Sequence, residues 1–281
     1  MRRLTAGIAV GIVVILTANL ALAATMIRGE VRPHYDDDKL LTILVIGSDA
    51  GLPRPGDPTR GRADGIHLIA VDTRRLRATI VDIPRDSYIS GDKVNAHLVY
   101  GGPERMKDVL SSYSGLKIDH YALTNFRGLR ALVHGMGGVN ITLEEGVHDS
   151  ASRANLDAGK QVLKGKPALA FSRARKTVAG GDFGRTRNQG LLLRAAHKDI
   201  RTRKRDLGTL THLIGVFGRN TTTDIPPGHL FQFAQLAVNI KPKNVKQVSL
   251  SGPTGFVGAA SIVNLNPGSA FSDIRKGRIG R

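Results

Sequence analysis

The chain has 281 residues, of which 41% are hydrophobic, and this composition predicts a globular protein with a substantial core. It contains no cysteine, which excludes disulfide bonds, cysteine nucleophiles and cysteine metal ligands. Its formal net charge of +18 at pH 7 is typical of proteins that bind nucleic acid, lipid head groups or other anionic polymers.

An uncharged, mostly aliphatic run of 24 residues extends from Leu4 to Ile27, directly after Arg2 and Arg3. As a helix it could cross a hydrocarbon core of about 30 Å, and the arginines favour a cytoplasmic N-terminus. We therefore expect residues 1–27 to form a cytoplasmic N-terminus and one anchor in the cell membrane. The alternative is a cleaved signal peptide, because Ala21-Leu22-Ala23 is a small-residue cleavage site, although the run exceeds the usual core of about 7–15 residues.

Residues 28–39 include Pro33 and three successive aspartates, a composition typical of a polar linker. We expect the folded domain to span residues 40–281 and to lie outside the cytoplasm. Such a domain meets head groups, anionic polymers and phosphorylated glycans, so nucleic acid is not an expected partner.

The first half of this domain alternates between strand-like and helix-like segments. Continuous apolar runs at 40–48, 65–73 and 76–84 are typical of strands buried on both faces, and residues 73–75 are short enough for a hairpin connection. Apolar residues then recur at helical spacing in residues 103–113. Next come a strand at 118–125, a helix at 126–136 and a strand at 138–143. The alternation predicts an α/β fold with α-β-α layers.

The second half is expected to contain helices at 163–175 and 188–205, and a further helix to about Phe217. A strand or turn at 220–225, a helix at 227–239 and a strand at 246–252 complete the expected elements. Residues 160–205 hold 14 lysine and arginine residues against two aspartates, so +12 of the net charge lies there. This concentration predicts a built anion site.

Four arginines lie around a Gly-Gly-Asp turn within that stretch: Arg173, Arg175, Arg185 and Arg187. Their guanidinium groups can converge on one phosphate-rich ligand, because each presents a planar fork of donors that matches phosphate geometry. We expect them partly on helices and partly on the glycine-rich loop between the helices.

Charged residues also stand at the ends of the first expected strands. Asp49 follows the first strand, Asp64 precedes the second and Arg85 follows the third. Two carboxylates beside a phosphorylated ligand suit Mg²⁺, which takes one or two protein carboxylates together with phosphate oxygens and water. The alternative is that Asp49 caps a turn, Asp64 begins a strand and Arg85 is solvated.

Seven motifs occur in an order and spacing that resemble proteins of the LytR-CpsA-Psr family, from the anchor to near the C-terminus. They are ILVIGSD, GRADGIHLIAVD, IVDIPRDSY, KVNAHLVYGG, GMGGVNITL, LKGKPALAFSRAR and GGDFGRTRNQ. The resemblance implies an α-β-α domain with a central mixed β-sheet. It also implies a membrane-anchored phosphotransferase, or ligase, that moves an anionic glycopolymer from a polyprenyl-diphosphate carrier to peptidoglycan with Mg²⁺. The polymer in this family is commonly a teichoic acid, a capsule or an arabinogalactan-type chain.

The resemblance also assigns roles residue by residue. Asp49 and Asp64 match the Mg²⁺-associated acids of the family, and Asp182 matches the acid of the last motif. The pyrophosphate-contacting residues are matched by Arg62, Arg85, Arg173, Arg175, Arg185, Arg187 and Gln189. Arg187 departs from members that carry this arginine one position later, where the chain has Asn188.

Phosphoryl transfer requires that the negative charge on the phosphate oxygens and on the leaving group be neutralised, which arginines and Mg²⁺ can do. Arg85, Asp64 and Asp182 are therefore the expected catalytic residues, with Asp64 or Asp182 accepting the proton of the attacking hydroxyl. An alternative role for Asp182 is to orient Arg175 and Arg185 through salt bridges. Two other functions stay open: a pyrophosphatase with water as acceptor, and a binding or regulatory module without turnover.

Overall fold

The computed structural model describes residues 40–50, 61–203 and 206–281. The expected membrane anchor and linker, residues 1–39, lie outside the described residues. Within the described ranges, no helix combines the length and hydrophobicity needed to span a bilayer.

A six-stranded sheet with the order β11-β6-β1-β2-β3-β12 forms the centre of the structure. Neighbouring strands are parallel in the β1/β6 and β3/β12 pairs and antiparallel in the other three pairs. The expected central mixed sheet is therefore confirmed. Its strands are β1 Leu40–Ser48, β2 Ala63–Asp72, β3 Arg77–Asp82, β6 His120–Asn125, β11 Thr222–Thr223 and β12 Val245–Ser249.

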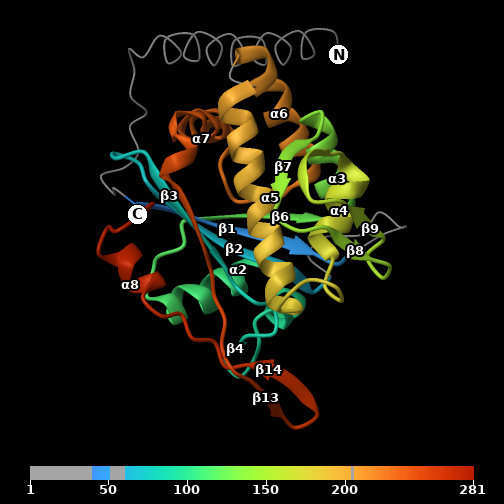
Figure 1. The fold of residues 1–281 in the computed structure, drawn as a ribbon. Coiled ribbons are helices and arrows are strands. Elements are labelled where there is room, and N and C mark those ends of the chain that lie inside the picture. The colour runs from blue at the N-terminus through green and yellow to red at the C-terminus, as the bar shows by residue number, and fades with distance from the viewer. Residues whose placement is uncertain (1–39, 51–60, 204–205) are drawn as a thin grey trace, which may run out of the picture.

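Both faces of this sheet are apolar, because alternate residues of its strands enter different cores. In β1, Leu44 and Ile46 belong to a core shared with helices α2 (Ala96–Ser114) and α8 (Ala270–Arg275). Leu41 and Ile43 belong to a core shared with α7 (Pro227–Asn239). Figure 1 shows α5 (Asp182–Arg203) crossing this second face. The α-β-α layers explain why the strand sequences are continuous apolar runs.

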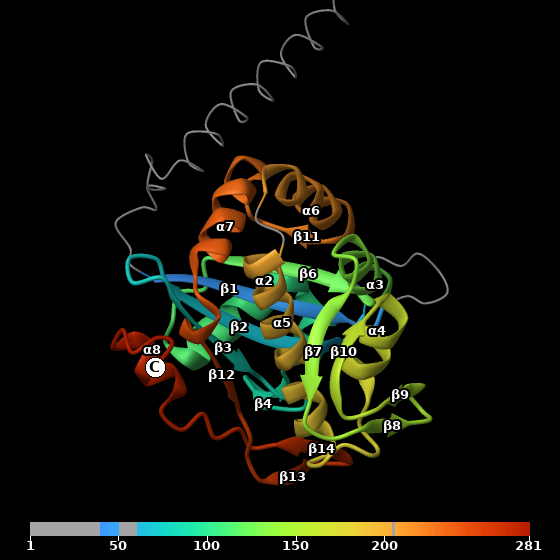
Figure 2. The ribbon, with the colours of Figure 1, turned by 45° about the horizontal axis from the view of Figure 1, so that its top comes forward.

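A third core lies beside the sheet, where α3 (Phe126–Gly135) and α4 (Gly165–Arg173) pack with α5. Helix α6 (Leu207–Asn220) packs against α3 and α7. Figure 2 shows α3 and α4 beside the short two-stranded sheet formed by residues 139–143 and 159–163. The short pairs are β7 Val139–Leu143 with β10 Gly159–Leu163, β8 Val147–Asp149 with β9 Ala154–Leu156, β4 Tyr88–Ile89 with β5 Asp92–Lys93, and β13 Thr254–Val257 with β14 Ala260–Val263. Except for β7, these short strands were not expected from the sequence.

Helix α5 begins six residues earlier than the hydrophobic spacing predicts. Gly180 and Gly181 precede it with φ of 82° and 56°, a left-handed conformation that glycine adopts without steric cost. The two glycines reverse the chain so that the helix begins at Asp182. Arg185 and Arg187 consequently lie on the first turns of the helix, which corrects their expected placement on the loop.

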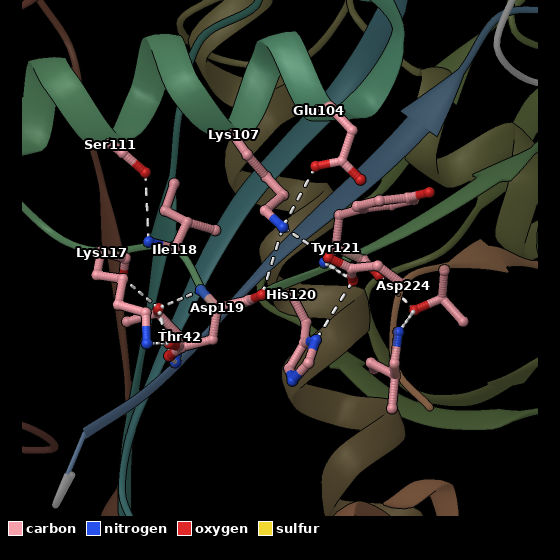
Figure 3. Close-up of polar contacts among 12 residues, drawn as sticks. Thr42, Glu104, Lys107, Ser111, Lys117, Ile118, Asp119, His120, Tyr121 and Asp224 are labelled. Carbon is pink, nitrogen blue, oxygen red and sulfur yellow. Dashed lines mark hydrogen bonds and ion pairs between the residues drawn. The ribbon is translucent and has the colours of Figure 1, made fainter. Parts of the chain in front are cut away.

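One end of the sheet is closed by a network of ion pairs and hydrogen bonds (Figure 3). Lys107 of α2 lies with its Nζ 2.6 Å from Asp224 Oδ2 and 3.4 Å from Glu104 Oε2. Asp224 Oδ1 accepts a hydrogen bond from the backbone N–H of Tyr121, at 2.8 Å, and Asp119 Oδ2 accepts one from Thr42 N, at 2.9 Å. Because β1 and β6 begin here, the network ties α2 to the start of the parallel strands.

Candidate functional site

The candidate site lies at the opposite end of the sheet, where β1 and β3 finish and β2 begins. Asp49 follows β1, Asp64 is the second residue of β2, and Arg85 follows β3. The backbone N–H of Asp49 donates to the carbonyl oxygen of Arg62 at 3.0 Å, and the N–H of Arg62 donates to Asp49 Oδ1 at 2.7 Å. These bonds continue the antiparallel pairing and place both aspartates at this end of the sheet.

Arg85 connects the strand ends to helix α5. Its Nη1 donates to Asp64 Oδ1 at 2.5 Å, while its Nε lies 3.9 Å from Asp182 Oδ1 and 3.7 Å from Asp86 Oδ2. Burial alone would lower the pKa of Arg85, but the three carboxylates together raise that pKa above its ordinary value. Arg85 is therefore a fixed cation at the centre of the site.

Asp182 is the first residue of α5 and contacts three guanidinium groups. Its Oδ1 lies 2.8 Å from Arg185 Nη2, 3.7 Å from Arg175 Nε and 3.9 Å from Arg85 Nε. A carboxylate at a helix N-terminus also interacts favourably with the helix dipole. Asp182 consequently holds arginines from three parts of the chain around one point.

Arg185 is buried, with 6% of its surface exposed. Burial lowers its pKa, Asp182 opposes this shift and nearby Arg85 adds to it. A guanidinium group nonetheless stays protonated at neutral pH, because its ordinary pKa is above about 12. The helix thus carries a desolvated positive charge into the site.

Several buried polar atoms of this cluster have no hydrogen-bond partner in the described part of the chain. They are Arg85 Nε, Arg185 Nε and Nη2, both carboxylate oxygens of Asp182, and Gln189 Oε1. The ion pairs are close, but their atoms are not aligned as hydrogen bonds. Unsatisfied buried donors on two guanidinium groups cost free energy. A ligand rich in acceptor oxygens, such as a phosphate, would satisfy them.

Gln189 joins three elements of the site. Its Nε2 donates to the carbonyl oxygens of Ser172, at 2.9 Å, and Asp64, at 3.3 Å. Gly65 permits this approach, because a Cβ at Gly65 would lie 3.3 Å from Gln189 Oε1. The side chain therefore locks α5 to α4 and to the start of β2.

The remaining predicted arginines lie at the margin of this cluster. Arg173 and Arg175 line an adjoining pocket of about 560 Å³, and the Arg173 guanidinium lies 4.8 Å above the centre of the Phe126 ring. Arg62 and Arg187 are exposed. The structure brings together Asp64, Arg85, Arg175, Asp182, Arg185 and Gln189, whereas Arg187 forms no ion pair among the described residues.

Asp149 lines the same pocket as Arg173 and Arg175, although nothing in its sequence context pointed to it. It is 2% exposed and accepts hydrogen bonds from four backbone N–H groups. The donors are Arg175 at 2.7 Å, Lys176 at 2.8 Å, Ala151 at 2.9 Å and Ser152 at 3.2 Å. These bonds, led by the one from Arg175, lower the pKa of Asp149. Asp149 therefore fixes the backbone that carries Arg175.

Asp82 forms a second buried polar network that sequence spacing did not reveal. It accepts from His67 Nδ1 at 2.8 Å, Gln247 Nε2 at 2.6 Å and Ser249 Oγ at 2.7 Å. A Cβ at Gly190 would lie 2.1 Å from Asp82 Oδ1, so glycine is needed where α5 crosses this carboxylate. The one sequence signal that could have revealed this network is Asp82 itself, a charged residue within the apolar run that forms β3.

Asp149→Asn is expected to lower the free energy of unfolding by about 1–3 kcal/mol, because several charge-assisted hydrogen bonds are weakened. Since folding lowers the pKa of Asp149, its stabilisation is complete above the unfolded value of about 3.9 and is lost as pH falls through the folded value. Urea unfolding at neutral and acidic pH should show this difference. Exposed Asp157→Asn is the matched control, and equal stability of both variants would contradict the role of Asp149.

The described residues contain no group of three or more His, Asp or Glu side chains that could hold a metal ion alone. Asp49, directly after β1, and Asp64, on the neighbouring strand β2, nevertheless provide two carboxylates, and Asp49 is exposed. Mg²⁺ needs only one or two carboxylates when phosphate oxygens and water complete its shell. The donor set therefore fits Mg²⁺ in the presence of a phosphorylated ligand.

Comparison with known proteins identifies similarity along most of the chain. The model of the LytR_cpsA_psr family matches residues 18–272. The chain is 32% identical over 190 residues to a protein of Corynebacterium glutamicum named probable cell wall biosynthesis protein LcpB. That alignment covers 62% of this chain and 46% of the relative, so the chain spans about half the relative's length.

A second relative is aligned over more of its length. The polyisoprenyl-teichoic acid–peptidoglycan teichoic acid transferase TagU of Enterococcus faecalis is 27% identical over 234 residues, which cover 80% of this chain and 74% of the relative. The crystal structure of B. subtilis TagV superposes with a TM-score of 0.71 and 22% identity, and the match covers 86% of this chain and 96% of that one. This structural similarity confirms the fold.

Proposed function

Since the chain belongs to the LytR-CpsA-Psr family, we propose that it is a phosphotransferase that attaches an anionic glycopolymer to peptidoglycan. The donor is a glycopolymer linked to a polyprenyl-diphosphate carrier. The observation that supports this donor most directly is the set of buried guanidinium nitrogens of Arg85 and Arg185 that lack hydrogen-bond partners in the described structure. The name of the TagU relative, a teichoic acid transferase, supports the same class of reaction.

In the proposed reaction, a sugar hydroxyl of peptidoglycan attacks the phosphorus nearer the glycopolymer. A new oxygen–phosphorus bond forms, and the bond from that phosphorus to the bridging oxygen breaks. Polyprenyl monophosphate leaves with the bridging oxygen. Arg85 and Arg185 bind the phosphate oxygens and stabilise the negative charge that develops on them, while Arg173 and Arg175 hold the polymer side from the adjoining pocket.

The proton of the attacking hydroxyl passes to Asp64 in this proposal. Asp64 forms an ion pair with Arg85, whereas Asp182 contacts Arg85, Arg175 and Arg185. The crowded position of Asp182 suits the orientation of arginines better than proton transfer. We therefore assign Asp182 a positioning role and Asp64 the role of proton acceptor.

Mg²⁺ would be held by Asp49 and Asp64 together with oxygens of the bound diphosphate. When bound, it would neutralise negative charge on the oxygens of the leaving polyprenyl phosphate. Arg62 lies beside Asp49, and its backbone N–H orients that carboxylate.

The apolar run in residues 4–27 would anchor the domain to the outer side of the cell membrane. This topology would place the site near both the lipid-linked donor and peptidoglycan.

The proposal is tested with full-length protein, a synthetic polyprenyl-diphosphate glycan and peptidoglycan fragments. Mass spectrometry should detect the linked product, and chelation of divalent cations should lower its rate of formation by more than about tenfold, because a positive charge beside the phosphate is lost. Restoring Mg²⁺ should restore the rate. Equal rates with and without chelator would contradict a role for the cation.

The same assay distinguishes the other two functions. Released glycan phosphate without a linked product would identify a pyrophosphatase that uses water as acceptor. A donor that binds but stays intact would identify a binding or regulatory module. Either result would overturn the proposed transfer to peptidoglycan.

A further inference from the structure

Residues 247–272 contain no Asp, Glu, Lys or Arg, although 23% of the chain is charged. This segment begins within β12, forms the hairpin β13–β14 and continues into the start of α8. In a chain with a net charge of +18, a surface segment of this length without charge differs sharply from its surroundings. Its partner is therefore expected to be neutral rather than anionic.

Phe256 of this hairpin is the most exposed large hydrophobic side chain of the described residues, with 76% of its surface accessible. Its cross-strand partner is Ser261, and Gly255, Gly258 and Ala260 are among its other neighbours in the hairpin. None of these residues is large enough to cover an aromatic ring. The ring is consequently left open to solvent, and adjacent Val257 is also exposed, so the hairpin presents two neighbouring large apolar side chains, as binding surfaces do.

The hairpin is attached directly beside the charged cluster of Asp64, Arg85, Asp182 and Arg185. The backbone N–H of Val263 donates to the carbonyl oxygen of Asp86 at 2.9 Å, and Val263 forms a β-bridge with Ser87. Asp86 in turn lies 3.7 Å from Arg85 Nε. Figures 1 and 2 both show β13 and β14 projecting beyond the body of the structure near β4. A chain bound along the hairpin could therefore reach the cluster.

A groove of about 360 Å³ lies at the base of the hairpin. Its walls include Ser251, Pro253, Asn266 and Ser269, and only Lys246 and Asp273 among its lining residues are charged. The aromatic ring of Phe256 follows the groove residue Pro253 by three positions in the chain. Hydroxyl and amide groups, together with an exposed aromatic ring, are suited to sugars, which present hydroxyl groups at their edges and C–H groups on their faces.

We propose that the β13–β14 hairpin, together with this groove, binds the neutral glycan strand that accepts the polymer. The inference rests on the proposed transfer reaction, for which it adds an acceptor subsite. The Phe256 ring stacks on one face of a sugar, and the groove binds an adjacent sugar. The acceptor is thereby held beside Arg85, separately from the arginines that bind the donor.

A membrane surface is the other candidate for an exposed phenylalanine. Protein segments that bind anionic bilayers usually combine apolar side chains with lysine or arginine. The hairpin and its flanking residues 247–272 contain neither. The absence of charge thus favours a glycan over a bilayer.

The chain contains no tryptophan, so Phe256→Trp introduces a single fluorophore at the proposed subsite. Full-length Phe256→Trp protein in lipid nanodiscs is titrated with chitohexaose, a neutral oligosaccharide. We expect its emission to shift to shorter wavelength with saturable binding. Quenching by brominated acyl chains, or no response to the oligosaccharide, would overturn the assignment.

The transfer assay provides a second measurement with a matched pair of variants. Phe256→Leu keeps an apolar side chain but removes the aromatic face, and Phe256→Tyr keeps the face. We expect Phe256→Leu to raise the KM for the acceptor by about 3- to 10-fold with unchanged donor binding, and Phe256→Tyr to resemble the wild type. An unchanged acceptor KM in Phe256→Leu would overturn the subsite.

The two measurements also separate failure of the subsite from failure of the proposed reaction. If the wild type forms no linked product while Phe256→Trp still binds chitohexaose, the transfer reaction is wrong and the glycan surface stands. If the wild type forms product and the oligosaccharide does not bind, the reaction stands and the subsite is wrong.

Discussion

Arg185→Ala is expected to lower kcat/KM for glycopolymer transfer by about 100- to 1000-fold. The buried Nε of Arg185 has no hydrogen-bond partner in the described structure, and Nη2, although 2.8 Å from Asp182 Oδ1, is not aligned as a hydrogen bond, so both can donate to a phosphate in a site shielded from water. The loss should therefore appear in the transfer step and in donor binding. Rates from the mass-spectrometric assay at several donor concentrations would measure both.

Folding should survive this substitution, because Asp182 keeps its contacts with Arg85 and Arg175 when Arg185 is removed. The matched control is Arg194→Ala, which removes an exposed arginine from the same helix and should leave the rate within about twofold. Arg185→Lys keeps the charge but loses the planar fork, so an intermediate rate is expected. Wild-type activity in Arg185→Ala would show that the phosphates bind elsewhere.

The framework of the fold was predictable because it depends on local hydrophobic pattern. The strand expected at 40–48 is β1 itself, and the helix expected at 227–239 is α7. The start of α5 was not predictable in this way, because the glycines before it and residues 182–189, in which Phe183 is the one large apolar side chain, give no apolar periodicity. The short pair β13–β14 was missed because each strand has only four residues, too few to show a clear alternation of apolar and polar residues.

The placement of charged residues at one end of the sheet was predictable where they flank strands, as at Asp49, Asp64 and Arg85. Asp149 and Asp82 were not, because their partners lie far away in sequence. Asp149 accepts hydrogen bonds from the backbone at residues 175 and 176, and Asp82 contacts Gln247 and Ser249. Backbone donors carry no sequence signal, and contacts across 165 or more residues exist only after folding.

Asp182→Asn is expected to lower kcat/KM by about 30- to 100-fold, because the arginines lose the charge that gathers them. Removing one partner of a buried charge cluster typically costs about 2–3 kcal/mol, which corresponds to this range. Asparagine has the same size, so it cannot clash, but it no longer neutralises Arg85, Arg175 and Arg185. The KM for the donor should rise together with the fall in kcat.

Donor binding decides whether Asp182 positions the arginines or accepts the proton. If it positions them, Asp182→Asn should weaken binding of the donor in the absence of acceptor, because Arg85, Arg175 and Arg185 no longer converge on the diphosphate. A residue that only accepts the proton of the acceptor hydroxyl would lower kcat and leave this binding unchanged. Wild-type donor affinity in Asp182→Asn, together with a reduced kcat, would therefore contradict the positioning role.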